Sequence, residues 1–324
     1  METDSETMAL SETAAAACRA RAKACGTSVL LRAVVEFTNV CHHNCAYCGM
    51  RAANSGLRRY SLAPDDIMGA AQRAAADGIG VIMLQGGDHL AYDMDGLAAV
   101  VEYIVSELRA TVLLCIGDRP LEDYERLYRA GARQAIVKFE TSNALLFKSL
   151  RPHSSLDRRL RLSGEVAALG YQLSSGFIQG LPGASPGDLE NDLEQLASLP
   201  LFAASVSPFI PSEQTPLRNS PYPELAAVLE TISSIRLAHP NLLIPAVSAL
   251  GILSQREDGD TSGQLRGLLA GANVLTVNYT PPSERENYVI YGPQRWIVER
   301  EYAMEVVRRA GLSLAQAKPA ESRR

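Results

Sequence analysis

Apolar stretches alternate with amphipathic stretches along most of the chain. The apolar stretches are short and rich in β-branched residues, which is typical of strands covered on both faces. They predict strands near residues 33–38, 80–85, 111–116, 134–139, 172–179, 203–208, 242–247 and 273–277. The amphipathic stretches have helical periodicity, and they predict helices near residues 8–25, 64–77, 95–109, 121–130, 155–169, 186–198, 222–238, 262–270 and 296–310.

Eight strands that alternate with helices are the pattern of an α/β fold, the (β/α)8 TIM-type barrel. This fold suits a chain of 324 residues with 47% hydrophobic residues, which can bury a large core. We therefore expect one large domain, and we expect residues 1–7 to be disordered. The expected division is an N-terminal tail and helix over residues 1–28, the barrel over 29–312 and a C-terminal tail over 313–324.

Charge and composition argue against several functions. The net charge is −5 and no basic stretch is long enough to follow phosphates, so we expect no nucleic-acid partner. The chain has no apolar run of about 18 residues, so we expect no membrane span. Residues 1–13 are polar and acidic, unlike a signal peptide. The six cysteines show no even framework, which fits a cytoplasmic location, and Cys18, Cys25 and Cys115 are expected to be packing residues.

The carboxyl ends of the predicted strands carry the candidate chemistry, because active sites of such barrels lie there. Polar residues and glycines interrupt the apolar pattern at each of these points: residues 41–48, 85–88, 117–118, 138–141, 179–183, 207–211, 247–249 and 278–281. A structural barrel needs turns at these positions. It does not need a lysine and a glutamate, Lys138 and Glu140, at the end of a buried strand.

Three cysteines, Cys41, Cys45 and Cys48, directly follow the first predicted strand. Three thiolates on one loop can hold three irons of a [4Fe–4S] cluster and leave the fourth iron open to a small molecule. A zinc site usually has a fourth Cys or His ligand, but His42 and His43 are too close to Cys41 in sequence for easy tetrahedral closure. An odd trio of cysteines in a chain without a secretion signal also argues against disulfides.

This cysteine spacing, with the aromatic Tyr47 before the last cysteine, resembles the motif of radical S-adenosylmethionine (SAM) enzymes. In that family the open iron binds the amino and carboxylate groups of SAM, and an electron from the cluster cleaves SAM to methionine and a 5′-deoxyadenosyl radical. The resemblance implies a barrel of the radical SAM class, with a [4Fe–4S] cluster on the three cysteines and SAM as second cofactor. It also implies a small-molecule substrate and an electron donor such as flavodoxin or ferredoxin.

Within that family, most of the chain resembles the HydE-type [FeFe]-hydrogenase maturase branch, which also contains methylornithine synthase; biotin synthase is more distant. The resemblance extends over residues 32–51, 84–88, 117–120, 139–151, 176–185, 208–211, 215–217, 244–251 and 271–278. It implies that SAM is bound by Tyr47, Gln85, Gly86, Gly87, Glu140, Arg159 and the turn formed by Gly180, Leu181 and Pro182. Arg158 is then the solvated neighbour of Arg159.

Several of these residues also have a purely structural interpretation. The segment Gln85-Gly86-Gly87 can be a plain turn, or its glycines can let the backbone approach a ligand. The Gly180–Pro182 turn can be only a turn, or one wall of an adenine site opposite Tyr47. Glu140 can accept hydrogen bonds from a ribose diol or pair with Lys138, since a period of two puts both on one face.

The substrate region departs from the resemblance. HydE-type maturases have Arg-His-Glu-Thr where this chain has residues 138–141, and two threonines where it has Val247 and Ser248. Lys138 keeps the positive charge of that arginine and loses its bidentate fork. We expect Lys138 and Ser248 to line a polar substrate cavity capped by Tyr288 and Tyr291, although the two tyrosines can also simply pack a C-terminal loop.

We therefore predict a radical SAM enzyme that acts on a small, amino-acid-like substrate, with its SAM machinery retained and its substrate site altered. The alternatives within the family are a true [FeFe]-hydrogenase maturase and an amino-acid mutase of the methylornithine synthase type. Two alternatives come from other classes. One is an electron-transfer or scaffold protein that carries a cluster, which would leave the glycines and carboxylate at the strand ends unexplained. The other is a zinc-stabilised barrel that acts as a binding module. Iron content and 5′-deoxyadenosine release separate these hypotheses.

Overall fold

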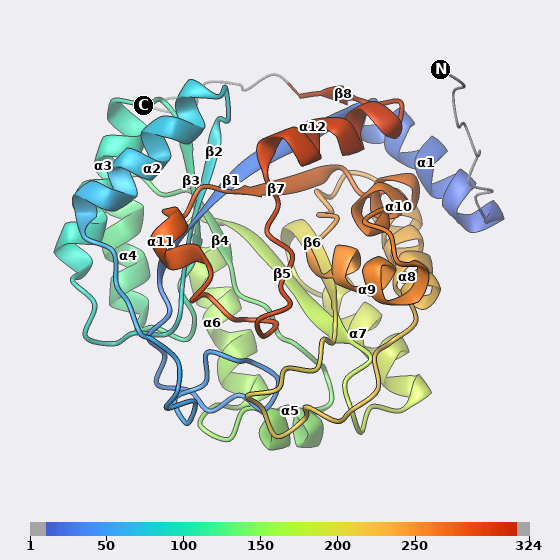
Figure 1. Cartoon of the computed structure of the whole chain (residues 1–324), viewed down its shortest axis with the longest axis horizontal. Coiled ribbons are helices and arrows are strands. Elements are labelled where there is room, and N and C mark those ends of the chain that lie inside the picture. The colour runs from blue at the N-terminus through green and yellow to red at the C-terminus, as the bar shows by residue number, and fades with distance from the viewer. Residues whose placement is uncertain (1–10, 316–324) are drawn as a thin grey trace.

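The computed structural model describes residues 11–315, and a parallel sheet forms its centre. Seven strands follow one another in the order β6-β5-β4-β3-β2-β1-β7, and helices surround them (Figure 1). The predicted α/β barrel is confirmed. The strands are β1 (Ser28–Thr38), β2 (Val81–Gly86), β3 (Thr111–Cys115), β4 (Gln134–Ile136), β5 (Gln172–Gln179), β6 (Leu201–Pro208) and β7 (Val274–Asn278).

The eighth position of the barrel is filled by single bridges instead of the strand predicted over residues 242–247. Leu243 bridges to Ala203 of β6, and Pro245 bridges to Val274 of β7. Pro245 has no amide hydrogen to donate, and the preceding amide, that of Ile244, donates to the Asn273 side chain at 2.8 Å. These two features prevent a regular ladder, but the segment still connects the two outer strands.

The predicted helices are all present in the described part of the chain. They are α1 (Glu12–Cys25), α2 (Pro64–Ala76), α3 (Met94–Ser106), α4 (Leu121–Arg129), α6 (Leu156–Ala168), α7 (Pro186–Ala197), α8 (Leu225–Ala238), α10 (Gly263–Leu269) and α12 (Arg300–Arg309). Four short elements were not predicted: α5 (Ala144–Leu150), α9 (Ala249–Asp258), α11 (Pro282–Arg285) and β8 (Ser313–Leu314). All four lie in connections or at the end of the barrel.

Both ends of the described chain lie at the same end of the barrel (Figure 1). Helix α1 packs against α8, and β8 pairs with the first residues of β1. The predicted C-terminal tail therefore begins with a paired strand, while the disorder predicted for residues 1–7 lies outside the described residues. No helix in residues 11–315 is long and apolar enough to cross a membrane; the cytoplasmic location stays a prediction.

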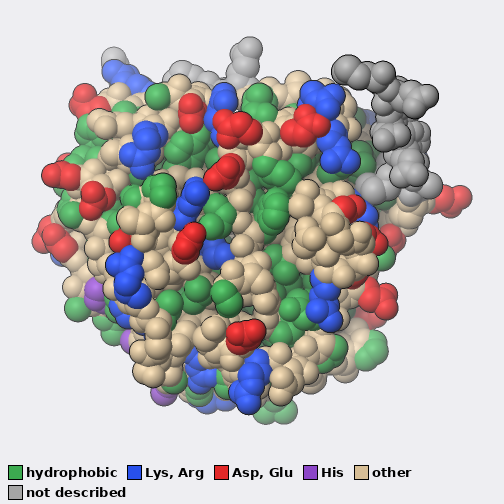
Figure 2. All heavy atoms as spheres, viewed as in Figure 1, with side chains coloured by type: hydrophobic (Ala, Val, Ile, Leu, Met, Phe, Trp, Pro, Cys, Tyr) green, Lys and Arg blue, Asp and Glu red, His purple; other side chains and the backbone are tan. Residues whose placement is uncertain are grey.

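Side chains alternate along β1 between two regions: the hydrophobic core between the sheet and the helices, and the cavities enclosed by the sheet. Ala33, Val35 and Phe37 are buried in the main hydrophobic core, where the sheet meets the surrounding helices. Arg32 and Glu36, on the opposite face of the strand, line cavities inside the barrel. Because successive side chains of a strand point to opposite faces, every strand contributes to both regions. Among the described residues on the face shown in Figure 2, basic and acidic side chains are interspersed.

Candidate functional site

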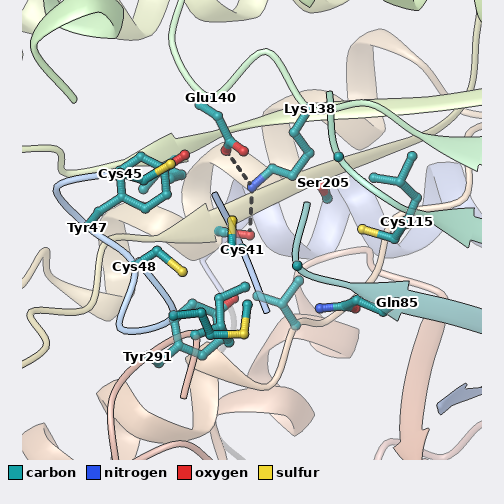
Figure 3. A pocket seen from close by; sticks show the side chains of 18 of the residues that line it. Cys41, Cys45, Tyr47, Cys48, Gln85, Cys115, Lys138, Glu140, Ser205 and Tyr291 are labelled. Carbon is teal, nitrogen blue, oxygen red and sulfur yellow. Dashed lines mark hydrogen bonds and ion pairs between the residues drawn. The ribbon is translucent and has the colours of Figure 1, made fainter. Parts of the chain in front are cut away.

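A cavity of about 260 Å³ opens at the carboxyl ends of the strands. Its wall brings together residues from strand ends, loops and helices that lie far apart in the sequence. They include Cys41, Cys45, Tyr47, Cys48, Gln85, Gly86, Gly87, Cys115, Lys138, Glu140, Arg151, Arg159, Ser205, Ser207, Val247, Tyr288 and Tyr291. Figure 3 shows the three motif cysteines and Tyr47 on one side of this cavity, with Lys138 and Glu140 above them and Gln85 and Cys115 opposite.

The cysteine loop is held by hydrogen bonds to its backbone. The guanidinium of Arg59 donates to the carbonyl oxygens of Asn39, Met50 and Arg51, each at 2.7 Å. Gly87 lies so close beneath the loop that a Cβ there would be 2.3 Å from the Val40 carbonyl oxygen. The close approach predicted for this glycine is therefore made to the protein's own cysteine loop.

The three motif cysteines are free and close to one another. Burial raises the pKa of each thiol, and the neighbouring cysteines raise the pKa of Cys48 further. Coordination to a metal deprotonates a thiol outright, so bound iron would supply the positive charge that these buried sulfurs lack. Three such thiols on one loop fit a [4Fe–4S] cluster.

The two histidines in the loop face Asp88, which argues against their joining the three cysteines in one zinc site. The Nε2 atom of His43 lies 3.0 Å from Asp88 Oδ2, and the Nδ1 atom of His42 lies 2.8 Å from the Asp88 carbonyl oxygen. Asp88 Oδ2 also accepts from the backbone amide of Asp118 at 2.9 Å. Asp88 thus attaches the cysteine loop to the loop after β3.

Lys138 and Glu140 lie on the same face of the chain after β4, as the period of two predicted. The Lys138 Nζ atom is 3.2 Å from Glu140 Oε2 and 3.1 Å from Ser207 Oγ. The ion pair that was one of the two interpretations of Glu140 is present, and both side chains line the cavity; the contact of Glu140 with a ribose stays a prediction. Glu140 has a φ of +65°, a conformation that costs a non-glycine residue about 1–3 kcal/mol and is enriched at functional sites.

A buried carboxylate, Asp118, binds two arginines of the cavity wall, Arg151 and Arg159. It accepts from Arg159 through Oδ1, and its Oδ2 accepts from Arg151 Nη2 and from Ser154 Oγ, both at 2.9 Å. Burial alone would raise the pKa of Asp118, but Arg159 and Arg151 hold it well below its usual range. Arg159 also donates from Nε to the Lys138 carbonyl oxygen at 2.6 Å. The arginine predicted to bind SAM is therefore already held in place by protein groups.

The turn after β5 lies beside Tyr47 rather than on the cavity wall. Leu181 packs in a small apolar cluster with Ile178 and Phe209, and Ala46 and Tyr47 pack against the same cluster. Gly180, with a φ of +80°, would clash with Pro223 if it carried a Cβ. The structural interpretation of this turn is confirmed, and its contact with an adenine ring stays a prediction.

The residues predicted for the substrate region divide between two cavities. Tyr288 and Tyr291 line the main cavity, and Tyr288 Oη accepts from Gln85 Nε2 at 3.0 Å. Ser248 lines a second cavity of about 130 Å³, which shares Val247 and Tyr291 with the first. Val247 faces the main cavity, and Ser248 is turned away from it because α9 begins at the next residue.

Several residues of the cavity wall, among them Arg32, Arg151, Cys115, Ser205 and Ser207, were not assigned to the site from the sequence. In the sequence analysis, Arg32 and Arg151 were only the end residues of segments that resemble the family, and Ser207 was part of the segment after a predicted strand. Cys115 was predicted to be a packing residue. Cys115 packs against a small apolar cluster, as predicted, and also lines the cavity, whereas Cys18 lies against the Leu269 carbonyl oxygen at 3.0 Å. A charged residue inside an apolar strand was the available signal for Arg32.

Comparisons with known proteins agree with this geometry. The model of the radical SAM superfamily matches residues 35–196. The [FeFe] hydrogenase maturase subunit HydE of Thermotoga maritima is 34% identical over 283 residues, 87% of this chain and 79% of that protein. The 3-methylornithine synthase of Methanosarcina barkeri is 28% identical over 305 residues, 91% of this chain and 81% of that protein. A crystal structure of methylornithine synthase superposes with a TM-score of 0.81 at 23% identity, covering 94% of this chain and 89% of that one.

Proposed function

The chain belongs to the radical SAM superfamily, and we propose that its substrate is a small amino-acid-like molecule whose carboxylate binds Lys138. Enzymes of this family use a [4Fe–4S] cluster and SAM, which together supply a 5′-deoxyadenosyl radical. We propose that separate groups of residues in this chain bind the cluster, SAM and the substrate.

Two sets of residues are proposed to hold the cofactors. Cys41, Cys45 and Cys48 bind the cluster, as their grouping on one buried loop supports. SAM is bound by Tyr47, Gln85, Gly86, Gly87, Glu140, Arg159 and the turn of Gly180, Leu181 and Pro182. Glu140 accepts hydrogen bonds from the ribose; its Oε2 atom is buried and has the Lys138 ammonium, at 3.2 Å, as its ion-pair partner.

The observation that carries the substrate class is the positive charge of the cavity wall. Lys138 has its ammonium group in the cavity, where Ser207 and Glu140 hold it. Arg32 lines both cavities, donates from Nε to Thr276 Oγ1 at 2.6 Å, and forms no ion pair within residues 11–315. Burial lowers the pKa of Arg32 to about 10, so it remains protonated at neutral pH. Cations with few partners in a buried site favour an anionic ligand.

Two narrower functions remain as alternatives. The similarity to HydE favours maturation of the [FeFe]-hydrogenase H-cluster, and the similarity to 3-methylornithine synthase favours an amino-acid mutase. Lys138 and Val247, at positions that differ from the HydE-type pattern, both line the cavity. This placement supports a substrate different from that of HydE. We further propose flavodoxin or ferredoxin as electron donor.

The test uses the full chain after anaerobic reconstitution with iron and sulfide. Reduction with dithionite in the presence of SAM should release 5′-deoxyadenosine, measured by chromatography, and a panel of amino acids should contain compounds that increase this release. Amides of those compounds, which keep the amino group and lack the carboxylate charge, should not increase it. A protein that holds its cluster and binds SAM but releases no 5′-deoxyadenosine contradicts the proposed enzyme. Equal stimulation by acids and amides contradicts the proposed carboxylate.

A further inference from the structure

Arg151 is a buried cation next to the predicted cluster, and it is not among the residues proposed to bind the cluster, SAM or the substrate. It ends α5 and is 7% exposed. The residue before it, Leu150, accepts a hydrogen bond from the Ala46 amide at 2.8 Å, so the end of α5 is attached directly to the cysteine loop. Arg151 also lines the cavity together with Cys45 and Tyr47.

The contacts of Arg151 hold its guanidinium in one place. Nη2 donates to Asp118 Oδ2 at 2.9 Å, and Nη1 donates to Tyr47 Oη at 3.1 Å. Its Nε is buried and has no acceptor among the described residues. Asp118 is 3% exposed and also binds Arg159, so its charge is shared between two arginines. The two guanidiniums together therefore exceed the one carboxylate by one positive charge.

Arg151 acts electrostatically on the cysteine loop. Its Nη1 donates to Tyr47, which lies between Cys45 and Cys48 in the loop, and Arg151 lines the same cavity as both cysteines. A fixed positive charge stabilises negative charge nearby, and more strongly where water is excluded. The reduction potential of an iron–sulfur cluster depends on net charge, hydrogen bonds and solvent exposure around it.

We propose that Arg151, held in position by Asp118, raises the reduction potential of the cluster bound by Cys41, Cys45 and Cys48. The inference rests on the proposed function, because it requires the cluster at these cysteines. Reduction adds one electron, supplied by an external low-potential reductant, to a cluster that three thiolates already make anionic. Arg151 offsets part of that added charge and remains protonated, so no proton transfer accompanies the step. Asp118 is the positioning residue.

The experiment measures the midpoint potential by anaerobic titration without SAM, followed by electron paramagnetic resonance. Arg151→Met removes the charge at similar length and should shift the potential to more negative values. Arg151→Lys keeps the charge and should restore most of the wild-type potential. Arg158→Met is the matched control: Arg158 is exposed, and its guanidinium donates to the Asp118 carbonyl oxygen at 3.4 Å. The cluster of the Arg158→Met variant should have the same midpoint potential as that of the wild type.

Asp118→Asn provides a second test if Arg151→Met does not hold a cluster. It keeps an acceptor for Arg151 and removes the compensating negative charge, so the potential should shift to more positive values. An unchanged potential in Arg151→Met with full iron content overturns the proposal, as does a negative shift or none in Asp118→Asn. A wild-type protein that binds no cluster would instead contradict the proposed function.

Discussion

The charged groups on the two sides of the cavity differ in how many protein groups they form hydrogen bonds or ion pairs with. The cluster side consists of the motif cysteines with His43, Asp88, Asp118, Arg151 and Arg159, and nearly every charge there has several protein partners. The substrate side consists of Arg32, Lys138, Ser207, Val247 and Tyr291. There, Lys138 contacts only Glu140 and Ser207, and Arg32 donates only to Thr276, among the residues that the structure describes.

This contrast indicates different roles for the two sides. A fully connected polar network is rigid and holds its members in one geometry, as the binding of two fixed cofactors requires. Buried cations with few partners are costly unless a ligand completes them. We therefore expect the residues of the substrate side to select the third ligand, and we expect substitutions on the two sides to have different effects.

The largest expected effect is on the cluster side. Cys45→Ala removes one of three thiolates, so the brown cluster absorbance and all SAM cleavage should be lost. The matched control is Cys115→Ala, which removes a thiol from the opposite wall of the same cavity and should keep the cluster. Absorbance spectra and 5′-deoxyadenosine release measure both. Formation of 5′-deoxyadenosine by Cys45→Ala would show that the cysteine assignment is wrong.

Lys138→Met should separate the substrate side from the cofactors. The variant loses the proposed carboxylate partner, so stimulation of 5′-deoxyadenosine release by the substrate should disappear while the SAM dissociation constant stays unchanged. Lys138→Arg is the control, since it keeps the charge and adds the bidentate fork, and should retain stimulation. Normal stimulation in Lys138→Met would remove Lys138 from the substrate site.

Glu140 lies at the boundary between the two sides, so its substitution shows to which ligand it belongs. Glu140→Gln keeps the shape but loses a charged hydrogen bond worth about 1.5–3 kcal/mol, so SAM should bind roughly tenfold more weakly or worse. Isothermal titration with SAM measures this, with Lys138→Met as the matched control because it breaks the same ion pair from the other end. An equal loss in both variants would mean that the ion pair has only a structural role.

The smallest effect is expected at Ser248, which lines the second cavity instead of the first. A neutral hydrogen bond is worth about 0.5–1.5 kcal/mol, so Ser248→Ala should raise the KM for substrate by about tenfold at most. Ser207→Ala removes the hydroxyl that contacts Lys138 and should have the larger effect of the two. The reverse order, measured by steady-state kinetics, would place the substrate in the second cavity.

Local patterns predicted the elements that regular periodicity defines. The alternation of apolar and amphipathic stretches predicted seven strands of the sheet and nine helices. It was wrong for residues 242–247, because Pro245 and the Asn273 side chain interrupt a ladder there. It also missed α5, whose short length hides its helical period and whose last turn leads into Arg151.

The sequence by itself determined the fold class, the three cysteines on one loop, and the common face of Lys138 and Glu140, since each follows from short-range spacing along a strand or loop. Only the tertiary structure decided which distant charges meet. Asp118, Arg151 and Arg159 come from the loop after β3, the end of α5 and the start of α6, and no local period relates them. It also decided that Cys115 lines the cavity and that Ser248 does not, because those outcomes depend on how the strands pack around a shared interior.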